Sequence, residues 1–282
     1  MKKMILFIMA MAICMGAISA QSKETQEKTV SVIQFDKVSI AASFTVRYTQ
    51  GPKHKCTIIA SPEDMKKVKA EVKDKQLKIY VEGQKKDAIK VNGITFNNAS
   101  IYGEVIVKIT SPELTKVSCL GSGDFVATTD IKSEDLEFMI SGSGNVKLKN
   151  VTADKLHLSI AGSGGIDMQQ AQAGNLNVDI AGSGDIDIND VASCKKALLS
   201  VAGSGDINAT FSGCQELACS IAGSGEMELK GKVVNYRSSV SGSGEITKKE
   251  LVITGDCREN GTNRGSFYRK KPRTVNNINA EP

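Results

Sequence analysis

The sequence predicts an all-β fold, a parallel β-helix (β-solenoid) with about 20 residues per rung. The first observation is that the tripeptide Gly-Ser-Gly occurs seven times, at intervals of 19 to 21 residues. The second is that apolar and polar residues alternate on both sides of each tripeptide, which is the period of a strand with one buried face. Because one such unit cannot bury its apolar face alone, we expect each to stack on its neighbours.

The first element, residues 1–20, has the features of a secretory signal peptide. Lys2 and Lys3 precede an apolar run over residues 4–17, and Ala20 ends a short stretch of small residues. The apolar run is too short to span a bilayer. We therefore expect cleavage after Ala20 and export to the periplasm, the outer-membrane surface or the medium. No later segment is long and apolar enough to predict a transmembrane helix.

The repeat segment, residues 116–250, is organised in columns, meaning sets of residues at equivalent positions of successive rungs. Two positions before each tripeptide stand apolar residues, namely Cys119, Ile140, Ile160, Ile180, Val201, Ile221 and Val240. A second apolar column follows the tripeptide and consists of Phe125, Val146, Ile166, Ile186, Ile207, Met227 and Ile246. Each unit is predicted to be a strand, a glycine corner, a second strand and a polar connection such as Asn189-Asp190.

The glycines of the tripeptides are predicted to be structural. Glycine is required where a backbone turns with positive φ or closely approaches another chain segment. The residues concerned are Gly121, Gly123, Gly142, Gly144, Gly162, Gly164, Gly182, Gly184, Gly203, Gly205, Gly223, Gly225, Gly242 and Gly244.

Residues 29–115 lack the tripeptide but are also strand-rich. Together with the Gly-Ser-Gly-Asp repeats, a set of short segments makes residues 31–250 resemble the family named putative auto-transporter adhesin, head GIN domain. These segments are Phe35 with Val38, Gln50-Gly51, Leu77-Lys78-Ile79-Tyr80 and Ser111-Pro112-Glu113-Leu114. This domain family of unknown function is common in exported proteins of Bacteroidota.

The resemblance implies a right-handed parallel β-helix whose first rungs come from residues 29–115. It implies no catalytic residue, because none is established for the family. Residues 255–282 lie beyond the repeat, and this polar and basic segment is expected to be a loose tail.

Acidic residues after the tripeptides are the candidate metal ligands. In a parallel stack, six carboxylates would lie in two adjacent columns: Asp167, Asp185, Asp187, Asp206, Glu226 and Glu228. Like charges about 5 Å apart repel one another, and carboxylate oxygens are natural ligands of Ca²⁺. A calcium-dependent binding module is therefore one alternative, and solvated side chains that keep the sheet soluble are the simpler interpretation.

A carbohydrate-active enzyme is the second alternative, because two carboxylates across a cleft can act as acid and base. The near-identity of the rungs argues against it, since no rung carries a distinctive catalytic group. The two histidines, His54 and His157, are interpreted as incidental. We therefore expect no enzymatic activity and no required cofactor.

The cysteines allow one disulfide prediction. Cys194 and Cys214 each lie nine residues before a tripeptide, so they should occupy one column in neighbouring rungs, close enough for a bond. Cys119 and Cys219 fall in inward columns and are interpreted as small buried residues.

Composition narrows the choice of partners. The formal net charge of +5 falls to about +3 without Lys2 and Lys3, and the chain has no Trp and 5% aromatic residues. Both features disfavour nucleic-acid binding. The sequence predicts a structural or adhesive protein that presents a regular surface to a glycan, a protein or another envelope component. It does not indicate the oligomeric state.

Overall fold

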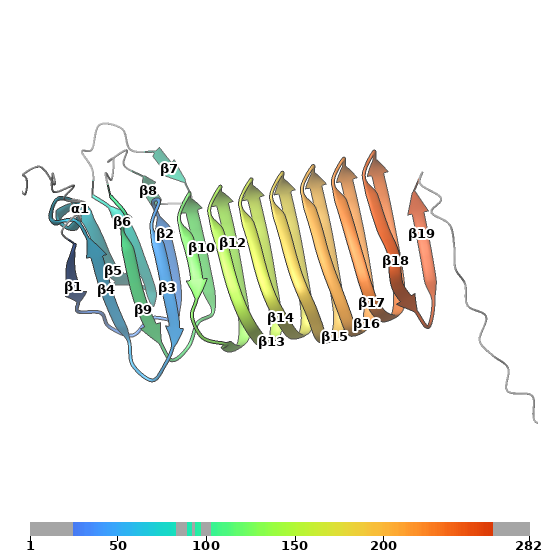
Figure 1. Cartoon of the computed structure of the whole chain (residues 1–282), viewed down its shortest axis with the longest axis horizontal. Helices are drawn as coiled ribbons and strands as arrows, with labels where there is room; N and C mark the ends of the chain where they lie inside the picture. Colours follow the sequence, from blue (N-terminus) through green and yellow to red (C-terminus); the bar gives the residue numbers. More distant parts are fainter. Residues whose placement is uncertain (1–24, 83–88, 92–93, 97–102, 262–282) are drawn as a thin grey trace, which may run out of the picture.

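A computed structural model of the chain describes residues 25–82, 89–91, 94–96 and 103–261 and forms a β-solenoid of about seven turns (Figure 1). The predicted fold class is therefore confirmed. The predicted signal peptide lies outside the described residues. Within the described residues, no helix has the length and hydropathy of a membrane span.

The repeat segment consists of strands that stack in parallel and in register. They are β10 (Lys116–Gly121), β11 (Asp124–Ala127), β12 (Ile131–Gly142), β13 (Asn145–Gly162), β14 (Gly165–Gly182), β15 (Asp185–Gly203), β16 (Asp206–Gly223), β17 (Glu226–Gly242) and β18 (Glu245–Ile253). Ile160 pairs with Ile180, and Gly162 pairs with Gly182. The predicted columns are thus real ladders, and their apolar members are buried in one continuous core, except Val240 and Ile246, which are partly buried against it.

Each rung differs from the prediction in one respect, because the expected polar connection is not a loop. In β13 the alternation of buried and exposed residues is broken at Lys149-Asn150 and again at Asp154-Lys155, while the strand continues through both places. We call these places the first and second bend. They divide a rung into a first face (145–148), a short face (151–153) and a long face (155–161). Two exposed residues in a row resemble a loop in the sequence, which is why the short face was missed.

The uneven repeat length arises at these bends. Between β14 and β15, Ala171 pairs with Val191 and the next residue, Gln172, pairs with Ser193. Ala192 of β15 is therefore an inserted residue. The register between β15 and β16 shifts again between Ile188 and Val191. Bulges at bends absorb extra residues without disturbing the ladders on the faces.

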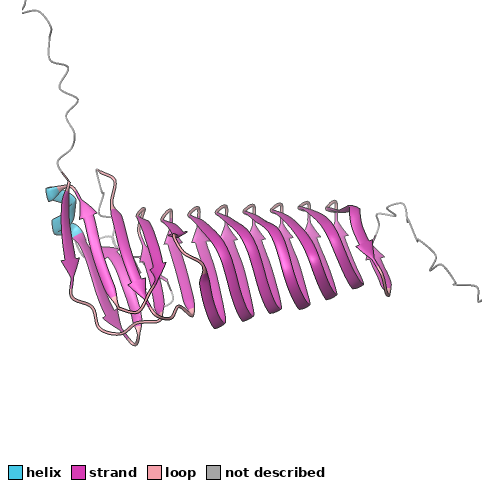
Figure 2. Ribbon diagram, turned by 60° about the horizontal axis from the view of Figure 1, so that its bottom comes forward, coloured by secondary structure: helices cyan, strands magenta, loops and turns pink. Residues whose placement is uncertain are grey.

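The glycine corners form a row of short turns along one edge of the solenoid (Figure 2). The first glycine of each corner has a positive φ, from +109° at Gly121 to +139° at Gly162. Ser204 donates its backbone N–H to the carbonyl of Gly182 in the rung before, at 2.8 Å. The first glycine of each corner thus has the backbone conformation that favours glycine over residues with a Cβ.

The amino-terminal part extends the solenoid and then closes it. Two coils continue the parallel stack: β2 (Lys37–Ala41) pairs with β10 and β6 (Gln76–Val81), and β3 (Thr45–Gln50) pairs with β11 and β9 (Ile106–Ser111).

Three antiparallel strands cover the end: β1 (Gln26–Val30), β4 (Lys55–Ala60) and β5 (Val68–Lys73). A short helix, α1 (Pro62–Lys67), follows β4, and β7 (Ile89–Val91) pairs with β8 (Ile94–Phe96) in a separate two-stranded sheet. The parallel coils and the antiparallel strands together form an amino-terminal cap.

The carboxyl-terminal end corrects one prediction. Residues 255–282 were expected to be loose, but β19 (Cys257–Gly261) pairs in parallel with β17. The pattern was obscured because this last rung places charged residues in inward columns. Glu259 pairs in register with the inward Ser238, and its carboxylate lies 2.6 Å from Nζ of Lys248. Residues 262–282 lie outside the described residues.

Candidate binding surfaces

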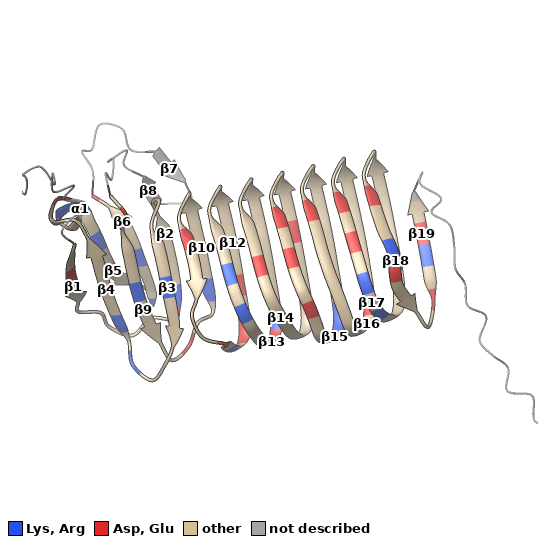
Figure 3. Ribbon diagram, viewed as in Figure 1, with Lys and Arg blue, Asp and Glu red and all other residues tan. Residues whose placement is uncertain are grey.

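The acidic columns lie on the first face. Asp185 pairs in register with Asp206, and Asp167 pairs with Asp187. Figure 3 shows that acidic residues, coloured red on the ribbon, occur in β14 to β17 in the parts of the strands near the glycine corners. The columns are not uniformly acidic, because Asn208 stands between Asp187 and Glu228.

Hydrogen bonds within the protein already engage several of these carboxylates. The side-chain amide of Asn208 donates to Oδ1 of Asp187 at 2.7 Å, and the backbone N–H of Glu226 donates to Oδ1 of Asp206 at 2.9 Å. Among the described residues, no three His, Cys, Asp or Glu side chains converge into a group that could hold a metal ion. A calcium site on this face stays a prediction.

Cys194 and Cys214 are placed in one column on the short face, in register in neighbouring rungs. Both side chains are buried, and no disulfide joins their sulfur atoms in the structure. A hydrogen bond between them lowers the pKa of Cys194 and raises that of Cys214. The structure therefore brings the two thiols together, and the disulfide stays a prediction.

Two pockets on the long face lie among the described residues. The larger pocket is a shallow depression of about 490 Å³ over β2, β10, β12, β13 and β14. It is lined by Lys37, Thr115, Lys116, Asp135, Leu136, Glu137, Lys155, Leu156, His157, Asn175 and Asn177. The polar lining comes almost entirely from two outward columns of the long face. The bend column, next to the second bend, contains Asp135, Lys155 and Asn175, and the face column contains Lys37, Lys116, Glu137, His157 and Asn177.

Four charged side chains of this pocket form ion pairs between neighbouring rungs. Nζ of Lys116 lies 2.9 Å from Oε2 of Glu137, and Nζ of Lys155 lies 3.1 Å from Oδ2 of Asp135. The first pair is partly buried, with 32% and 29% of its two side chains exposed.

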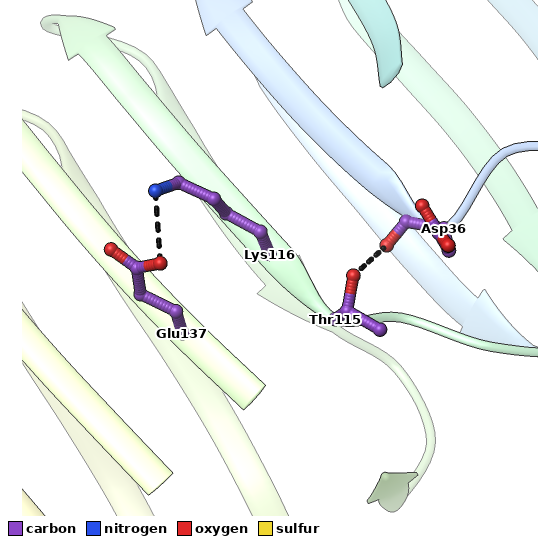
Figure 4. A network of polar contacts seen from close by, with 4 residues as sticks. All are labelled: Asp36, Thr115, Lys116 and Glu137. Atoms are coloured by element: carbon purple, nitrogen blue, oxygen red, sulfur yellow. Dashed lines mark hydrogen bonds and ion pairs between the residues drawn. The ribbon is translucent and has the colours of Figure 1, made fainter. Parts of the chain in front are cut away.

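Polar contacts also fix the start of β10. Figure 4 shows the Lys116–Glu137 pair beside Thr115, whose hydroxyl donates to the carbonyl of Asp36 at 3.2 Å. These contacts hold the lining side chains in defined positions before any ligand binds.

The second pocket, of about 210 Å³, lies over β15, β16, β17 and β19. Its lining continues the same two columns with Lys196, Glu216, Asn235 and Asp256 in the bend column and Ala218, Arg237 and Arg258 in the face column. The two pockets are therefore aligned along the solenoid axis. Sequence reasoning missed them because each rung contributes a different polar residue, so no repeated motif marks the columns.

The histidines have more defined roles than the sequence indicated. His157 lines the larger pocket, and its Nε2 lies 3.0 Å from Oδ2 of Asp179. His54 is half-buried against Phe35, and its Nδ1 accepts the backbone N–H of Phe35 at 3.4 Å. The two side chains belong to different parts of the molecule and share no site.

The fold and these surfaces place the protein in the class of all-β solenoids, with shallow polar pockets on the long face. A family profile described as putative auto-transporter adhesin, head GIN domain, matches residues 34–213 and 189–268. The chain belongs to this family. No curated protein matches the chain.

Solved structures from Bacteroidales are similar to the chain over most of its length. A putative lipid binding protein from Parabacteroides distasonis is 26% identical with a TM-score of 0.65, and the match covers 84% of this chain and 97% of that one. A putative adhesin from Bacteroides fragilis is 24% identical with a TM-score of 0.64, over 80% of this chain and 98% of that one. A putative adhesin from the same Parabacteroides species is 23% identical with a TM-score of 0.60, over 84% and 98%. The last two comparisons support the fold alone.

Proposed function

We propose that the protein is an exported, non-catalytic adhesin-like solenoid that binds a glycan, protein or lipid component of a cell envelope. Membership in a family of putative adhesins supports this proposal. The observation that carries it is the pair of aligned polar pockets on the long face, both lined by side chains that are fixed by ladders beneath them. Rigid elements position binding groups more accurately than loops do.

The lining of the pockets favours binding over catalysis. The two carboxylates of the larger pocket, Asp135 and Glu137, each contact a lysine instead of facing one another across a cleft. Glycoside hydrolysis needs two carboxyl groups on opposite sides of the scissile bond. Here both come from the same strand, β12.

A binding screen with the chain from Gln21 onward tests the proposal. We expect saturable binding to at least one of three probes: a glycan array, immobilised envelope proteins, or vesicles of envelope lipids. Failure to bind any of the three would contradict a binding function. Release of shortened glycan products during the incubation would contradict the non-catalytic part.

The same screen tests the calcium alternative when it is run in calcium chloride and in excess chelator. Two of the first-face carboxylates, Asp187 and Asp206, already accept hydrogen bonds from neighbouring rungs, so we expect equal binding in both conditions. Binding that requires calcium would instead assign a metal-dependent role to the acidic columns.

A further inference from the structure

We propose that the bend column and the face column together form one elongated site for an uncharged, linear glycan that lies along the solenoid axis. This inference rests on the proposed binding function and specifies its ligand and its location. The two pockets would be the ends of that site, with the larger over β2 to β14 and the smaller over β15 to β19.

The spacing of the rungs matches such a ligand. Neighbouring parallel strands lie roughly 4.8 Å apart, which is close to the advance of one pyranose ring in an extended glycan chain. In-register pairing continues along the face column from Lys37 through His157 to Arg258. Each sugar can therefore meet one rung, and successive sugars meet equivalent positions.

The chemistry of the lining suits hydroxyl groups. Lysine and arginine only donate hydrogen bonds, carboxylates only accept them, and asparagine does both. In the larger pocket a donor and an acceptor stand side by side, as in Lys116 with Glu137 and Lys155 with Asp135. A sugar hydroxyl both donates and accepts, so one hydroxyl can contact both members of such a pair.

The charges of each pocket nearly cancel. The larger pocket contains Lys37, Lys116 and Lys155 against two carboxylates, and the smaller contains Lys196, Arg237 and Arg258 against Glu216 and Asp256, so each has one cation in excess. Two of the three lysines of the larger pocket are already paired with carboxylates of the protein, which leaves little free positive charge to attract a polyanion.

The segment between the pockets is compatible with a continuous ligand. The face column there contains Leu198, and Ala218 of the smaller pocket follows it; both residues are half-buried and uncharged. Their apolar side chains can contact the ring face of a sugar while the polar residues on either side bind hydroxyls. The site therefore needs no rearrangement to accept a chain that spans both pockets.

The test compares a groove variant with a matched control variant. Lys116→Ala/Glu137→Ala removes the partly buried ion pair of the larger pocket without changing the net charge. Lys69→Ala/Glu82→Ala removes an exposed ion pair of the amino-terminal cap that lines neither pocket, again at constant net charge. Calorimetry with neutral oligosaccharides, from disaccharide to octasaccharide, and with polyanionic glycans measures affinity for each protein. Circular dichroism and a melting curve confirm that both variants are folded.

We expect affinity for a neutral glycan to rise with chain length, to be insensitive to salt, to fall about tenfold in the groove variant, and to stay within about twofold in the control. Equal loss in both variants, or no loss in either, would place the site elsewhere. Binding that is confined to polyanions and weakened by salt would overturn the uncharged ligand. Binding to envelope protein or lipid without glycan binding would overturn this inference and leave the proposed function standing. Binding to nothing would remove both.

Discussion

Individual glycines at the corners are held by two separate constraints. Gly203 has a φ of +134°, a conformation that side chains with a Cβ rarely adopt, and a Cβ on it would collide with the carbonyl of Gly182. The second glycine of the same corner, Gly205, has no space either, because its Cβ would meet the carbonyl of Gly184. The colliding atoms are backbone of the rung beneath, so neither clash can be relieved by rotating a side chain.

Replacing a corner glycine by alanine should therefore be costly. We expect Gly203→Ala to lower the free energy of unfolding by about 2 kcal/mol or more, because both φ strain and a backbone collision are introduced. Gly213→Ala is the control, since Gly213 has nothing within 4 Å of an added Cβ. We expect Gly213→Ala to change the free energy of unfolding by no more than about 1 kcal/mol. Urea denaturation measures both, and equal effects would contradict the structural role of the corner.

The thiols of Cys194 and Cys214 make a second residue-scale prediction. Oxidised glutathione should accept two electrons from the pair as the S–S bond forms and two protons leave, because in-register neighbours lie within disulfide range. We expect thiol titration of the unfolded, oxidised protein to show two fewer thiols, and mass spectrometry to find the two peptides linked. The bond should raise the free energy of unfolding by about 3 kcal/mol. A Cys214→Ala variant that loses equally many thiols on oxidation would assign the bond to other cysteines.

Two core thiols predict a response to alkaline pH. Burial raises the pKa of Cys56 and of Cys119 to about 12. An unfolded thiol loses its proton above about pH 9, whereas the buried thiol keeps it. The contribution of these protonated thiols to the free energy of unfolding is therefore fully present below about pH 9. It is lost as the pH rises toward 12, by about 1.4 kcal/mol per pH unit for each thiol.

Urea denaturation across this pH window checks the alkaline response. A Cys56→Ala/Cys119→Ala variant should show a shallower decline than the unsubstituted protein. An identical slope in the two proteins would mean that other groups, such as buried tyrosines, control the response.

Rungs are the elements of this fold, and their interchangeability can be tested directly. Deleting residues 165–184 joins Gly164 to Asp185 and places β13 under β15, with Val146 below Ile186 and the glycine corners still aligned. Because repeat stability is roughly a sum over rungs and their interfaces, we expect a folded protein with a urea m-value lower by about a tenth.

The matched control removes only residues 165–174, which leaves half a coil between two corners. That segment is too short to form three faces, so the chain should lose cooperative unfolding. A half-rung variant as stable as the full-rung variant would contradict the fixed coil. The measurement for both is urea unfolding followed by circular dichroism.

At this scale the repeat segment was predictable and the ends were not. The columns could be predicted because the corner glycines and the inward residues, such as Ile160 and Ile180, recur with the rung period. The bends could not be predicted, because two consecutive polar residues such as Lys149-Asn150 have the sequence pattern of a loop. The antiparallel pairing of β4 with β9 connects segments that share no repeat. The binding columns were hidden for a different reason, because Asp135, Lys155 and Asn175 share a position and no chemical type.

The whole molecule must protect both ends of its core. The amino-terminal end is covered by antiparallel strands and α1. At the other end, Val240, Ile246, Leu251 and Ile253 are only partly buried. Lys248 and Glu259 lie among them as an inward ion pair, with Nζ of Lys248 5.8 Å from the ring centroid of Tyr236. Inward charges at an open edge discourage another chain from pairing there.

Removing this pair should therefore promote association. We expect Lys248→Met/Glu259→Leu to fold, because an ion pair can be replaced by apolar residues of similar volume at little cost. Its end becomes an apolar surface beside the strand edges of β18 and β19, so sedimentation velocity should show larger species than the unsubstituted protein at the same concentration. Lys69→Met/Glu82→Leu, which removes an exposed pair of the amino-terminal cap, should sediment as the unsubstituted protein does. If the end variant also sediments unchanged at high concentration, the ion pair is not what keeps this end from self-pairing.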